Sequence, residues 1–419
     1  MENKRYICVD LKSFFASVEC VERGLDPMTA ALAVADGERG EGTICLAVSV
    51  GLKKLGVKNR CRLYEIPKGI RFIMASPRMK LYMEYSAKVY GVYLDFFSDE
   101  DIYVYSVDEA FIDVSPYLKM YKTNELGLAR AVLERITEKT GLKASCGIGT
   151  NLYLAKIALD ISAKKSEDFI GYLDEEKYKA ELWDHVPITD FWQIGRGTAA
   201  RLAKLGIYTM RGIAQCDEDL LYRLFGINAQ ILIDHAFGIE PVEMCHIKSY
   251  KHKSHSISSG QVLMRDYEFD EALVIVKEML YEICLRLTAE ELVCSSITLT
   301  VLYSAKVNCE PSRGTVRAQC PTDSYSCWKE LITKLYYEKV SRDFPIRRLN
   351  LSCMQVKKDS GRQLSIFDSE DSLRELRLQR SVCSIKARFG KNSVVKALDL
   401  QGCATAIDRN MQIGGHKSG

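Results

Sequence analysis

The chain has 419 residues, 47% of them hydrophobic, so it is long enough for about two to four domains with packed cores. The N-terminus does not resemble a signal peptide and no apolar stretch is long enough to span a membrane, which predicts a cytoplasmic protein. The 15 cysteines show no CxxC pair or other zinc spacing, so we expect scattered reduced thiols rather than disulfides or a zinc site.

The formal net charge is only +3, but the charges are distributed unevenly. Residues 342–396 contain 13 Lys or Arg against 6 Asp or Glu, a local excess of +7, whereas acidic residues gather around Asp108. This asymmetry indicates that one part of the chain contacts a polyanion while another part binds cations. A solvated basic tail is the alternative.

The first part of the chain alternates between predicted strands and helices. An apolar strand over 6–10 ends at Asp10, and a second over 102–107 ends at Asp108 and Glu109. Further strands are predicted at 31–35 and 143–149, and helices at 13–23, 77–92, 125–139 and 152–163. Strands mixed with covering helices predict an α/β or α+β domain.

Three carboxylates therefore lie at the ends of two otherwise apolar strands. A buried carboxylate without a partner is costly, and a cation relieves that cost. Oxygen ligands from two strands suit Mg²⁺, which also binds substrate phosphates. The sequence therefore predicts a metal site formed by Asp10, Asp108 and Glu109. Surface acids at strand ends are the alternative.

Residues 171–240 are predicted to be helical with short turns. Within them, Gly195-Arg196-Gly197 precedes a helix. Glycines at this position let backbone N–H groups approach a phosphate at the helix N-terminus, where the helix dipole also favours an anion. Residues 196–209 therefore predict a helix-hairpin-helix that holds a nucleic-acid backbone without reading bases. An ordinary helical turn is the alternative.

Residues 241–355 open with a basic segment in which Lys248, Lys251 and Lys253 alternate with Ser and His. The lysines suit phosphate contacts, and metal binding by the histidines is the alternative. Helices at 269–290 and 324–340 and strands at 295–302 and 347–356 predict a βαβ-like unit.

The chain is polar from Lys357 onward, except for the apolar island Gln363-Leu364-Ser365-Ile366-Phe367. A tail gains nothing by exposing Leu, Ile and Phe unless they dock on a partner. An amphipathic segment over 372–398 follows.

Three segments resemble the signature blocks of Y-family translesion DNA polymerases, and the nearest match is the bacterial UmuC-like or polymerase IV/V branch. The blocks are Asp10-Leu-Lys-Ser-Phe14-Phe15-Ala-Ser-Val-Glu19, Tyr105-Ser106-Val107-Asp108-Glu109-Ala110-Phe111 and Gly147-Ile148-Gly149-Thr-Asn151-Leu-Tyr-Leu-Ala155-Lys156. Their order and spacing agree with that family, and a weaker likeness extends along the rest of the chain.

The resemblance implies an α+β multidomain protein built as a right hand. Its parts would be a palm (1–30 and 75–170), small fingers (31–74), a helix-hairpin-helix thumb (171–240), an α/β little finger (241–357) and a flexible tail (358–419) with a clamp-binding peptide. The implied function is low-fidelity, template-directed DNA synthesis on damaged DNA within the SOS response. We expect a monomer that uses primer-template DNA, deoxynucleoside triphosphates and a sliding clamp.

The resemblance also implies roles for single residues. Asp10, Asp108 and Glu109 would be catalytic and would hold two Mg²⁺ ions, assisted by the Leu11 carbonyl. Phe14 and Phe15 would lie near the nucleotide, with Phe15 as the steric gate against ribonucleotides, whereas Phe14 fits a core position better. Lys53 and Lys164 would bind the triphosphate, and Gly195, Arg196, Gly197, Lys248, Lys251 and Lys253 would bind DNA.

The chain departs from the family pattern where the triphosphate is held. Val50-Gly51-Leu52-Lys53 stands where many relatives have Tyr-Glu-Ala-Arg, so a tyrosine hydroxyl is lost and a lysine replaces bidentate arginine. The expected palm lysine falls at Ala163, and a shift of one residue would let Lys164 replace it. These changes concern nucleotide affinity and lesion preference rather than the reaction.

The apolar island resembles a sliding-clamp-binding peptide of the form Gln-Leu-x-Leu-Phe. Leu364, Ile366 and Phe367 would fill an apolar groove on the clamp, with Gln363 at its rim and Ser365 between them. Such a tether would raise the effective concentration of a weakly binding enzyme.

Two other classes of protein remain as alternatives. A nucleotide cyclase on a similar palm also uses acids at strand ends and two metals, but it does not need a phosphate-binding thumb, a basic third domain or a clamp peptide. A DNA-bound accessory protein without catalysis would not need the three carboxylates.

Overall fold

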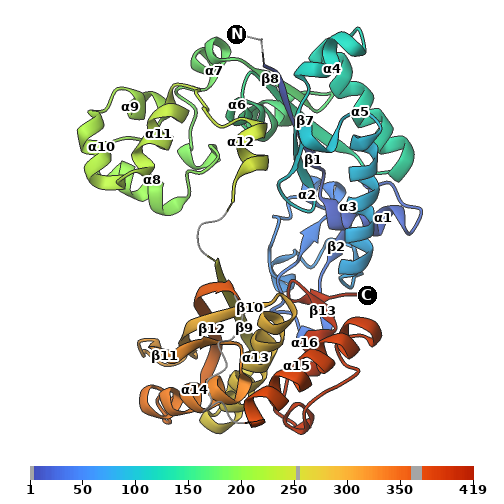
Figure 1. The fold of residues 1–419 in the computed structure, drawn as a ribbon. Coiled ribbons are helices and arrows are strands. Elements are labelled where there is room, and N and C mark those ends of the chain that lie inside the picture. Colours follow the sequence, from blue (N-terminus) through green and yellow to red (C-terminus); the bar gives the residue numbers. More distant parts are fainter. Residues whose placement is uncertain (1–3, 252–254, 360–369) are drawn as a thin grey trace. The chain divides into compact units, whose positions relative to one another are not determined.

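The computed structural model describes residues 4–251, 255–359 and 370–419 (Figure 1). The chain divides into two compact units, Met1–Tyr250 together with Ser418–Gly419, and Lys251–Lys417. The division falls after Tyr250 rather than at the predicted residue 241, because helix α12 (Met244–Ser249) packs on the first unit, against β5.

The first unit is built on a five-stranded sheet with the order β5-β6-β1-β7-β8. Its strands are β1 (Tyr6–Leu11), β5 (Ile102–Val104), β6 (Glu109–Asp113), β7 (Ala144–Gly149) and β8 (Ile170–Leu173). Neighbouring strands are antiparallel except β7 and β8, which are parallel. Residues 171–173, predicted to begin the helical region, therefore belong to this sheet because they pair with β7.

Side chains of β1 alternate between the two faces of the sheet, as the two-residue period of a strand requires. Ile7, Val9 and Leu11 lie in the larger core, which also includes residues of α1 (Phe14–Val21), α3 (Met79–Leu94) and α5 (Glu125–Thr140). Tyr6 and Cys8 lie in a second core on the other face, together with residues of α6 (Leu152–Ile157). Asp10 follows the same alternation, so it shares the face that α6 covers.

Two glycines of β7 explain how closely α6 lies on the sheet. A Cβ at Gly147 would lie 2.1 Å from the Ala155 carbonyl oxygen, and one at Gly149 would lie 2.2 Å from the Ala155 nitrogen. Any other residue at these two positions would push the helix away. The α6 helix continues into a π-helical turn over Ala158–Ser162, and such turns often occur at functional sites.

A smaller sheet of the first unit has the order β3-β2-β4, formed by β2 (Leu32–Val34), β3 (Ala47–Val48) and β4 (Ile73–Ala75). Helix α2 (Val50–Lys54) follows β3, and the Ser49 hydroxyl caps it by accepting a hydrogen bond from the Leu52 N–H. Leu52 is buried in the core of this part together with Cys45 and Cys61. This small body corresponds to the predicted 31–74 segment.

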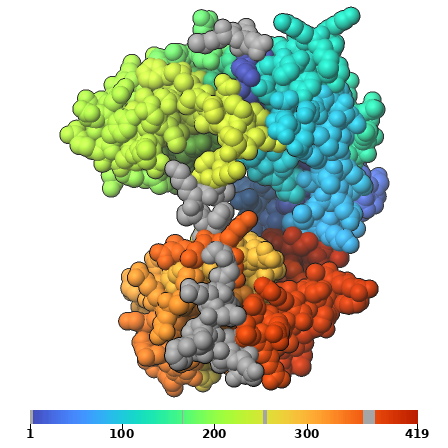
Figure 2. All heavy atoms as spheres, in the orientation of Figure 1, coloured from blue at the N-terminus to red at the C-terminus, as the bar shows by residue number. Residues whose placement is uncertain are grey.

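Four helices form a compact lobe that Figure 2 shows in yellow-green. They are α8 (Arg196–Ala203), α9 (Met210–Ala214), α10 (Glu218–Phe225) and α11 (Asn228–Ala236). Gly206 has φ +73° in the connection between α8 and α9, and Gly226 has φ +61° between α10 and α11. These conformations favour glycine, so the two hairpins are encoded locally. The remaining helices of the first unit are α4 (Ser115–Met120) and α7 (Glu175–Leu182).

The second unit packs helices against a four-stranded antiparallel sheet with the order β11-β10-β12-β9. Its elements are β9 (His255–Tyr267), α13 (Phe269–Ala289), β10 (Leu292–Tyr303), β11 (Ser312–Thr322), α14 (Tyr325–Lys339) and β12 (Ile346–Lys358). Trp328 and Ile297 are fully buried in its core. The predicted helices and the two inner strands are confirmed. The βαβ-like unit is wrong, because β10 and β12 run antiparallel.

Sequence patterns did not predict β9 and β11, the two edge strands. The β11 sequence Ser-Arg-Gly-Thr-Val-Arg-Ala-Gln-Cys-Pro-Thr is polar and contains Gly and Pro, which are tolerated at a sheet edge but conceal the strand signal.

The prediction of a flexible tail over 358–419 is corrected for the residues described beyond 369. Helix α15 (Glu370–Phe389) packs on α13, where the Gln379 amide donates to the Thr288 hydroxyl at 2.8 Å and Val382 is buried. Helix α16 (Ala406–Asn410) is preceded by Thr405, whose N–H donates to Glu278 at 3.0 Å. The chain ends with a short pair, β13 (Gln412–Ile413) and β14 (His416–Lys417). Helix α15 falls largely within the amphipathic segment predicted over 372–398, but its packing on α13 was not predicted, because polar contacts such as that of Gln379 make part of it.

Within the described part of the chain, no helix combines the length and the apolar character needed to cross a bilayer.

Candidate active site

The acidic pair lies at a hairpin rather than at the end of a strand over 102–107. Strand β5 ends at Val104, the chain reverses over 105–108, and Glu109 is the first residue of β6. The N–H groups of Tyr105 and Ser106 both donate to the Glu109 carbonyl, which closes the turn. The prediction of a strand over 102–107 is wrong, because the residues after Val104 form the turn between β5 and β6 instead of extending β5.

The sheet register brings the three predicted carboxylates together. Asp10 is the cross-strand partner of Glu109 on β6, and the Leu11 N–H donates to the Asp108 carbonyl at 3.0 Å. Asp10 and Glu109 are a directly opposed pair, so their side chains share the face that α6 covers. The Asp108 carboxylate accepts a hydrogen bond from the Ser106 hydroxyl at 2.7 Å.

The electrostatics of Asp10 show that these carboxylates influence one another. Burial, and then the charges of Asp108 and Glu109, raise the pKa of Asp10 to about 7, while Lys156 opposes them. Such a shift means that the surroundings of Asp10, through burial first and neighbouring carboxylates second, disfavour its charged form. A hard divalent cation with oxygen ligands fits this donor set.

The Glu109 carboxylate is paired with a cation of the protein itself. It forms an ion pair with the buried ammonium of Lys156 on α6, and the Lys156 ammonium also lies 3.1 Å from Asp160. Accordingly, among the described residues no group of three or more Asp, Glu, His or Cys side chains is arranged to hold a metal ion. The sequence placed Lys156 in the third signature block without assigning it a role, although a lone lysine in the apolar run of α6 was a detectable signal.

Two lysines, Lys12 and Lys53, lie within the electrostatic influence of Asp10, and both also interact with Lys164. Burial lowers the pKa of both Lys12 and Lys53; Asp10 opposes this, and Lys164 lowers both values further. The Lys53 ammonium donates to the hydroxyl of Ser13, which has φ 48° in the turn between β1 and α1. Ala163 is fully buried while Lys164 is exposed, which supports the one-residue shift. Lys12 was missed, although it lies in the first signature block.

The two adjacent phenylalanines have different environments. Phe14 is 2% exposed and lies in the core, so its side chain is not available to a nucleotide. Phe15 is partly exposed, and its ring lies 4.8 Å from the ring of Tyr82. The structure therefore leaves Phe15 as the candidate gate.

The predicted DNA contacts fall into three groups. Gly195 and Gly197 have open space around them at the start of α8, and Arg196 beside them is exposed. Lys248 instead donates to the Asp99 carbonyl at 2.6 Å, so its ammonium already has a partner within the first unit. Lys251 is exposed. Lys253 and the peptide Gln363–Phe367 lie outside the described residues.

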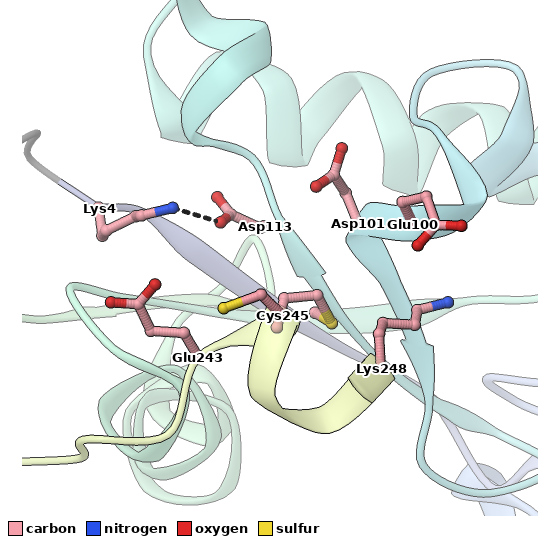
Figure 3. A pocket seen from close by; sticks show the side chains of 8 residues that line it. Lys4, Glu100, Asp101, Asp113, Glu243, Cys245 and Lys248 are labelled. Atoms are coloured by element: carbon pink, nitrogen blue, oxygen red, sulfur yellow. Dashed lines mark hydrogen bonds and ion pairs between the residues drawn. The ribbon is translucent and has the colours of Figure 1, made fainter. Parts of the chain in front are cut away.

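A separate hollow of about 210 Å³ lies at the opposite end of the β1–β6 ladder (Figure 3). The carboxylates of Glu100, Asp101, Asp113 and Glu243 and the ammonium groups of Lys4 and Lys248 line it around Cys245. Asp113 pairs with Tyr6, four residues before Asp10, which places this end roughly 13 Å from the carboxylate pair. The hollow is therefore not part of the candidate active site.

Comparison with known proteins identifies the class to which this fold and site belong. Residues 9–160 match the impB/mucB/samB family, and residues 254–366 match the C-terminal domain of that family. The chain is 31% identical to the putative UV-damage repair protein UvrX of Bacillus subtilis (strain 168), over 99% of this chain and 98% of that protein. It is also 31% identical to DNA polymerase IV 2 of the same organism, over 99% of both chains.

A solved structure, the Y-family DNA polymerase chimera Dbh-Dpo4(243-245)-Dbh, has the same fold, with a TM-score of 0.65. The two sequences are 23% identical, and the match covers 84% of this chain and 99% of the chimera. The α+β class is therefore confirmed. The chain belongs to the impB/mucB/samB family, that is, to the Y-family translesion DNA polymerases. As a member it is a DNA-directed DNA polymerase of translesion synthesis, as the sequence predicted.

Proposed function

We propose that this chain extends a primer on damaged DNA with low fidelity by two-metal nucleotidyl transfer, using Asp10, Asp108 and Glu109 as the catalytic carboxylates. The observation that supports this most directly is the pairing of Asp10 with Glu109 beside the Asp108 hairpin. Burial and the neighbouring carboxylates Asp108 and Glu109 raise the pKa of Asp10, and a divalent cation would stabilise its charged form.

Two Mg²⁺ ions, when bound, would lower the pKa of the primer 3′-hydroxyl and neutralise charge on the triphosphate and the leaving pyrophosphate. The protein's part is to fix the ligands: β1 presents Asp10 and the Leu11 carbonyl, and the β5–β6 hairpin presents Asp108 and Glu109.

The lysines beside Asp10 suit the triphosphate. Lys12, Lys53 and Lys164 concentrate positive charge close to the carboxylates, and ammonium groups bind phosphate oxygens through charge-assisted hydrogen bonds. Phe15 would lie under the sugar, where a ring leaves no room for a 2′-hydroxyl.

In this proposal the five-stranded sheet and its helices are the palm (1–30 and 75–170, extended to Leu173), and the small sheet is the fingers (31–74). The helical lobe is the thumb, whose open α8 N-terminus would meet a DNA phosphate. The second unit is the little finger, from Lys251 rather than from 241.

We further propose, from the sequence alone, that Gln363–Phe367 tethers the enzyme to a sliding clamp. Changing Leu364, Ile366 and Phe367 together to Ala removes apolar burial of roughly 1.5–3 kcal/mol per side chain. Clamp stimulation of primer extension should disappear while extension without the clamp is retained. Equal stimulation of the triple variant and the parent would contradict the tether.

Primer extension with Mg²⁺ tests the central proposal. Asp108→Ala and Glu109→Ala should abolish nucleotide addition while primer-template binding is nearly unchanged. Asp113→Asn is the matched control, because Asp113 lies on the same strand at the far end of the ladder and should retain activity. Near-normal extension by the two alanine variants would remove the metal-site assignment. Incubation with nucleotide alone separates this activity from that of a cyclase.

A further inference from the structure

Lys156 is a buried lysine that contacts a predicted metal ligand directly. Lys156 is 8% exposed, and its ammonium contacts the carboxylates of Glu109 on β6 and of Asp160 in the π-helical turn. A buried ammonium is stable only when it is paired, so these two carboxylates hold it in place.

The fold leaves this ammonium little freedom to move away. Gly147 and Gly149 let α6 lie directly on β7, and Lys156 follows Ala155, whose backbone makes that close approach. Asp160 is four residues after Lys156, so both side chains lie on the same side of the helix. The Lys156 ammonium is therefore within reach of both carboxylates on this face of the sheet.

We propose that Lys156 is a positioning residue that neutralises Glu109 in the metal-free protein and competes with a divalent cation for this carboxylate, with Asp160 taking the ammonium when the cation binds. The proposal rests on the function proposed above. It accounts for the ion pair between Lys156 and Glu109, and for the finding that the described residues hold no group of three or more side chains arranged for a metal ion.

Competition predicts opposite changes in cation binding when Lys156 is replaced and when Asp160 is replaced. Lys156→Met removes the competing charge and should tighten divalent-cation binding about threefold to tenfold, because one positive charge leaves the immediate surroundings of the ligands. Asp160→Asn removes the alternative acceptor, so Lys156 stays on Glu109 and cation binding should weaken by about the same factor.

The measurement is binding of Mn²⁺ alone to the full-length protein, without DNA or nucleotide, followed by electron paramagnetic resonance of free Mn²⁺. Lys164→Met is the matched control. It removes a lysine whose charge acts on Lys12 and Lys53, whereas the ion pair of Glu109 is made by Lys156, so its effect reports charge alone. Lys156→Met should tighten Mn²⁺ binding more than Lys164→Met does.

Thermal unfolding of the same metal-free proteins gives a second readout. Lys156→Met should lower the melting temperature of the metal-free protein, because Glu109 and Asp160 lose their shared cation. Addition of Mn²⁺ should then raise the melting temperature of this variant by more than it raises that of the parent. Lys156→Arg keeps the charge and should retain Mn²⁺ affinity close to that of the parent, which preserves the test if the Met variant folds poorly.

Unchanged or weaker Mn²⁺ binding by Lys156→Met, or weakening by both Lys156→Met and Asp160→Asn, would overturn the competition and leave Lys156 a purely structural residue. A parent protein whose Mn²⁺ binding does not depend on Asp108 would instead remove the metal site itself, and the present inference with it.

Discussion

Phe14 and Phe15 are neighbours in the chain, and the turn at Ser13 that starts α1 directs them to different surroundings. Phe14 fills the core, whereas Phe15 packs on Tyr82 and keeps part of its ring exposed. A gate must be reachable by the substrate and must act by volume alone, so only Phe15 qualifies.

Replacing Phe15 with Ala should therefore admit ribonucleotides while activity with deoxynucleotides is retained. The measurement is the ratio of ribonucleotide to deoxynucleotide incorporation in single-nucleotide primer extension. Phe14→Ala is the control: it should cost about 3–5 kcal/mol of stability and leave the ratio unchanged. A ratio that changes in the Phe14 variant but not in the Phe15 variant would reverse the assignment.

Glu19 joins α1 to α3 through a buried ion pair. It is fully buried and accepts hydrogen bonds from the Arg78 guanidinium at 2.9 and 2.8 Å and from the Tyr82 hydroxyl at 2.7 Å. Burial alone would raise the pKa of Glu19, but these bonds and one from Arg23 hold it below its usual range.

Glu19→Gln should destabilise the protein by about 2–4 kcal/mol in urea unfolding, because it leaves Arg78 without its counter-charge. The loss should shrink as the pH falls below the ordinary glutamate value of 4.5, since a carboxylate with a lowered pKa stabilises the fold only while ionised. Glu138→Gln, which breaks an exposed pair with Arg135, should cost less than about 1 kcal/mol. Equal losses in the two variants would mean that the Glu19 pair adds no more than a surface pair.

At the scale of elements, the contact between α6 and β7 decides the geometry of the site. The strand supplies no side chain at Gly147, and the helix backbone occupies that space. This approach is what places Lys156 against Glu109.

Gly147→Ala should destabilise the protein by about 3 kcal/mol or more, because the new methyl group would lie 2.1 Å from the Ala155 carbonyl oxygen. Gly91→Ala in α3 is the control: no atom lies within 4 Å of its Cβ, so it should stabilise by about 0.5–1 kcal/mol. Urea unfolding measures both, and a Gly147 variant as stable as the parent would show that α6 does not lie this close.

Lys396 anchors the C-terminal segment of the second unit between two tyrosines. Its ammonium lies 3.7 Å from the ring centre of Tyr281 and 3.4 Å from that of Tyr325. Burial, and then Lys329, lower the pKa of Lys396 to about 8.

A lysine whose pKa is lower in the folded state makes the protein more stable as the pH rises, because the unfolded chain still binds the proton between about 8 and 10.5. The stability of Lys396→Met relative to the parent should therefore fall as the pH is raised from 8 to 10. Exposed Lys391→Met should show no such trend. Thermal unfolding across this range is the measurement, and parallel curves for Lys396→Met and the parent would contradict the lowered pKa.

At the scale of the whole molecule, DNA binding should be strongly salt-dependent and nearly blind to sequence, because the candidate contacts are positive side chains and backbone N–H groups. Arg196→Ala should reduce the slope of log affinity against log salt by about one unit. Lys248→Ala should leave the slope unchanged, since its ammonium is already bonded to the Asp99 carbonyl. Filter binding at several salt concentrations tests both, and a marked base preference would contradict the picture.

The sequence by itself determined the strands around Asp10, the helices with a clear apolar period and the identity of the three carboxylates. These features can be read locally, because a strand or helix with one buried face repeats apolar residues at a fixed spacing along the sequence. It also determined the polymerase family through three blocks whose order and spacing are specific.

Only the tertiary structure decided which residues surround those carboxylates. The register of β1 against β6 sets Asp10 opposite Glu109, and the absence of side chains at Gly147 and Gly149 brings Lys156 beside them. Lys12, Lys53 and Lys164 come from three separate segments and meet only when the sheets are assembled. The edge strand β9 pairs with β12, which is distant in the sequence, and the Gln379 amide of α15 bonds to the distant Thr288; the choice of such partners leaves no period in the sequence.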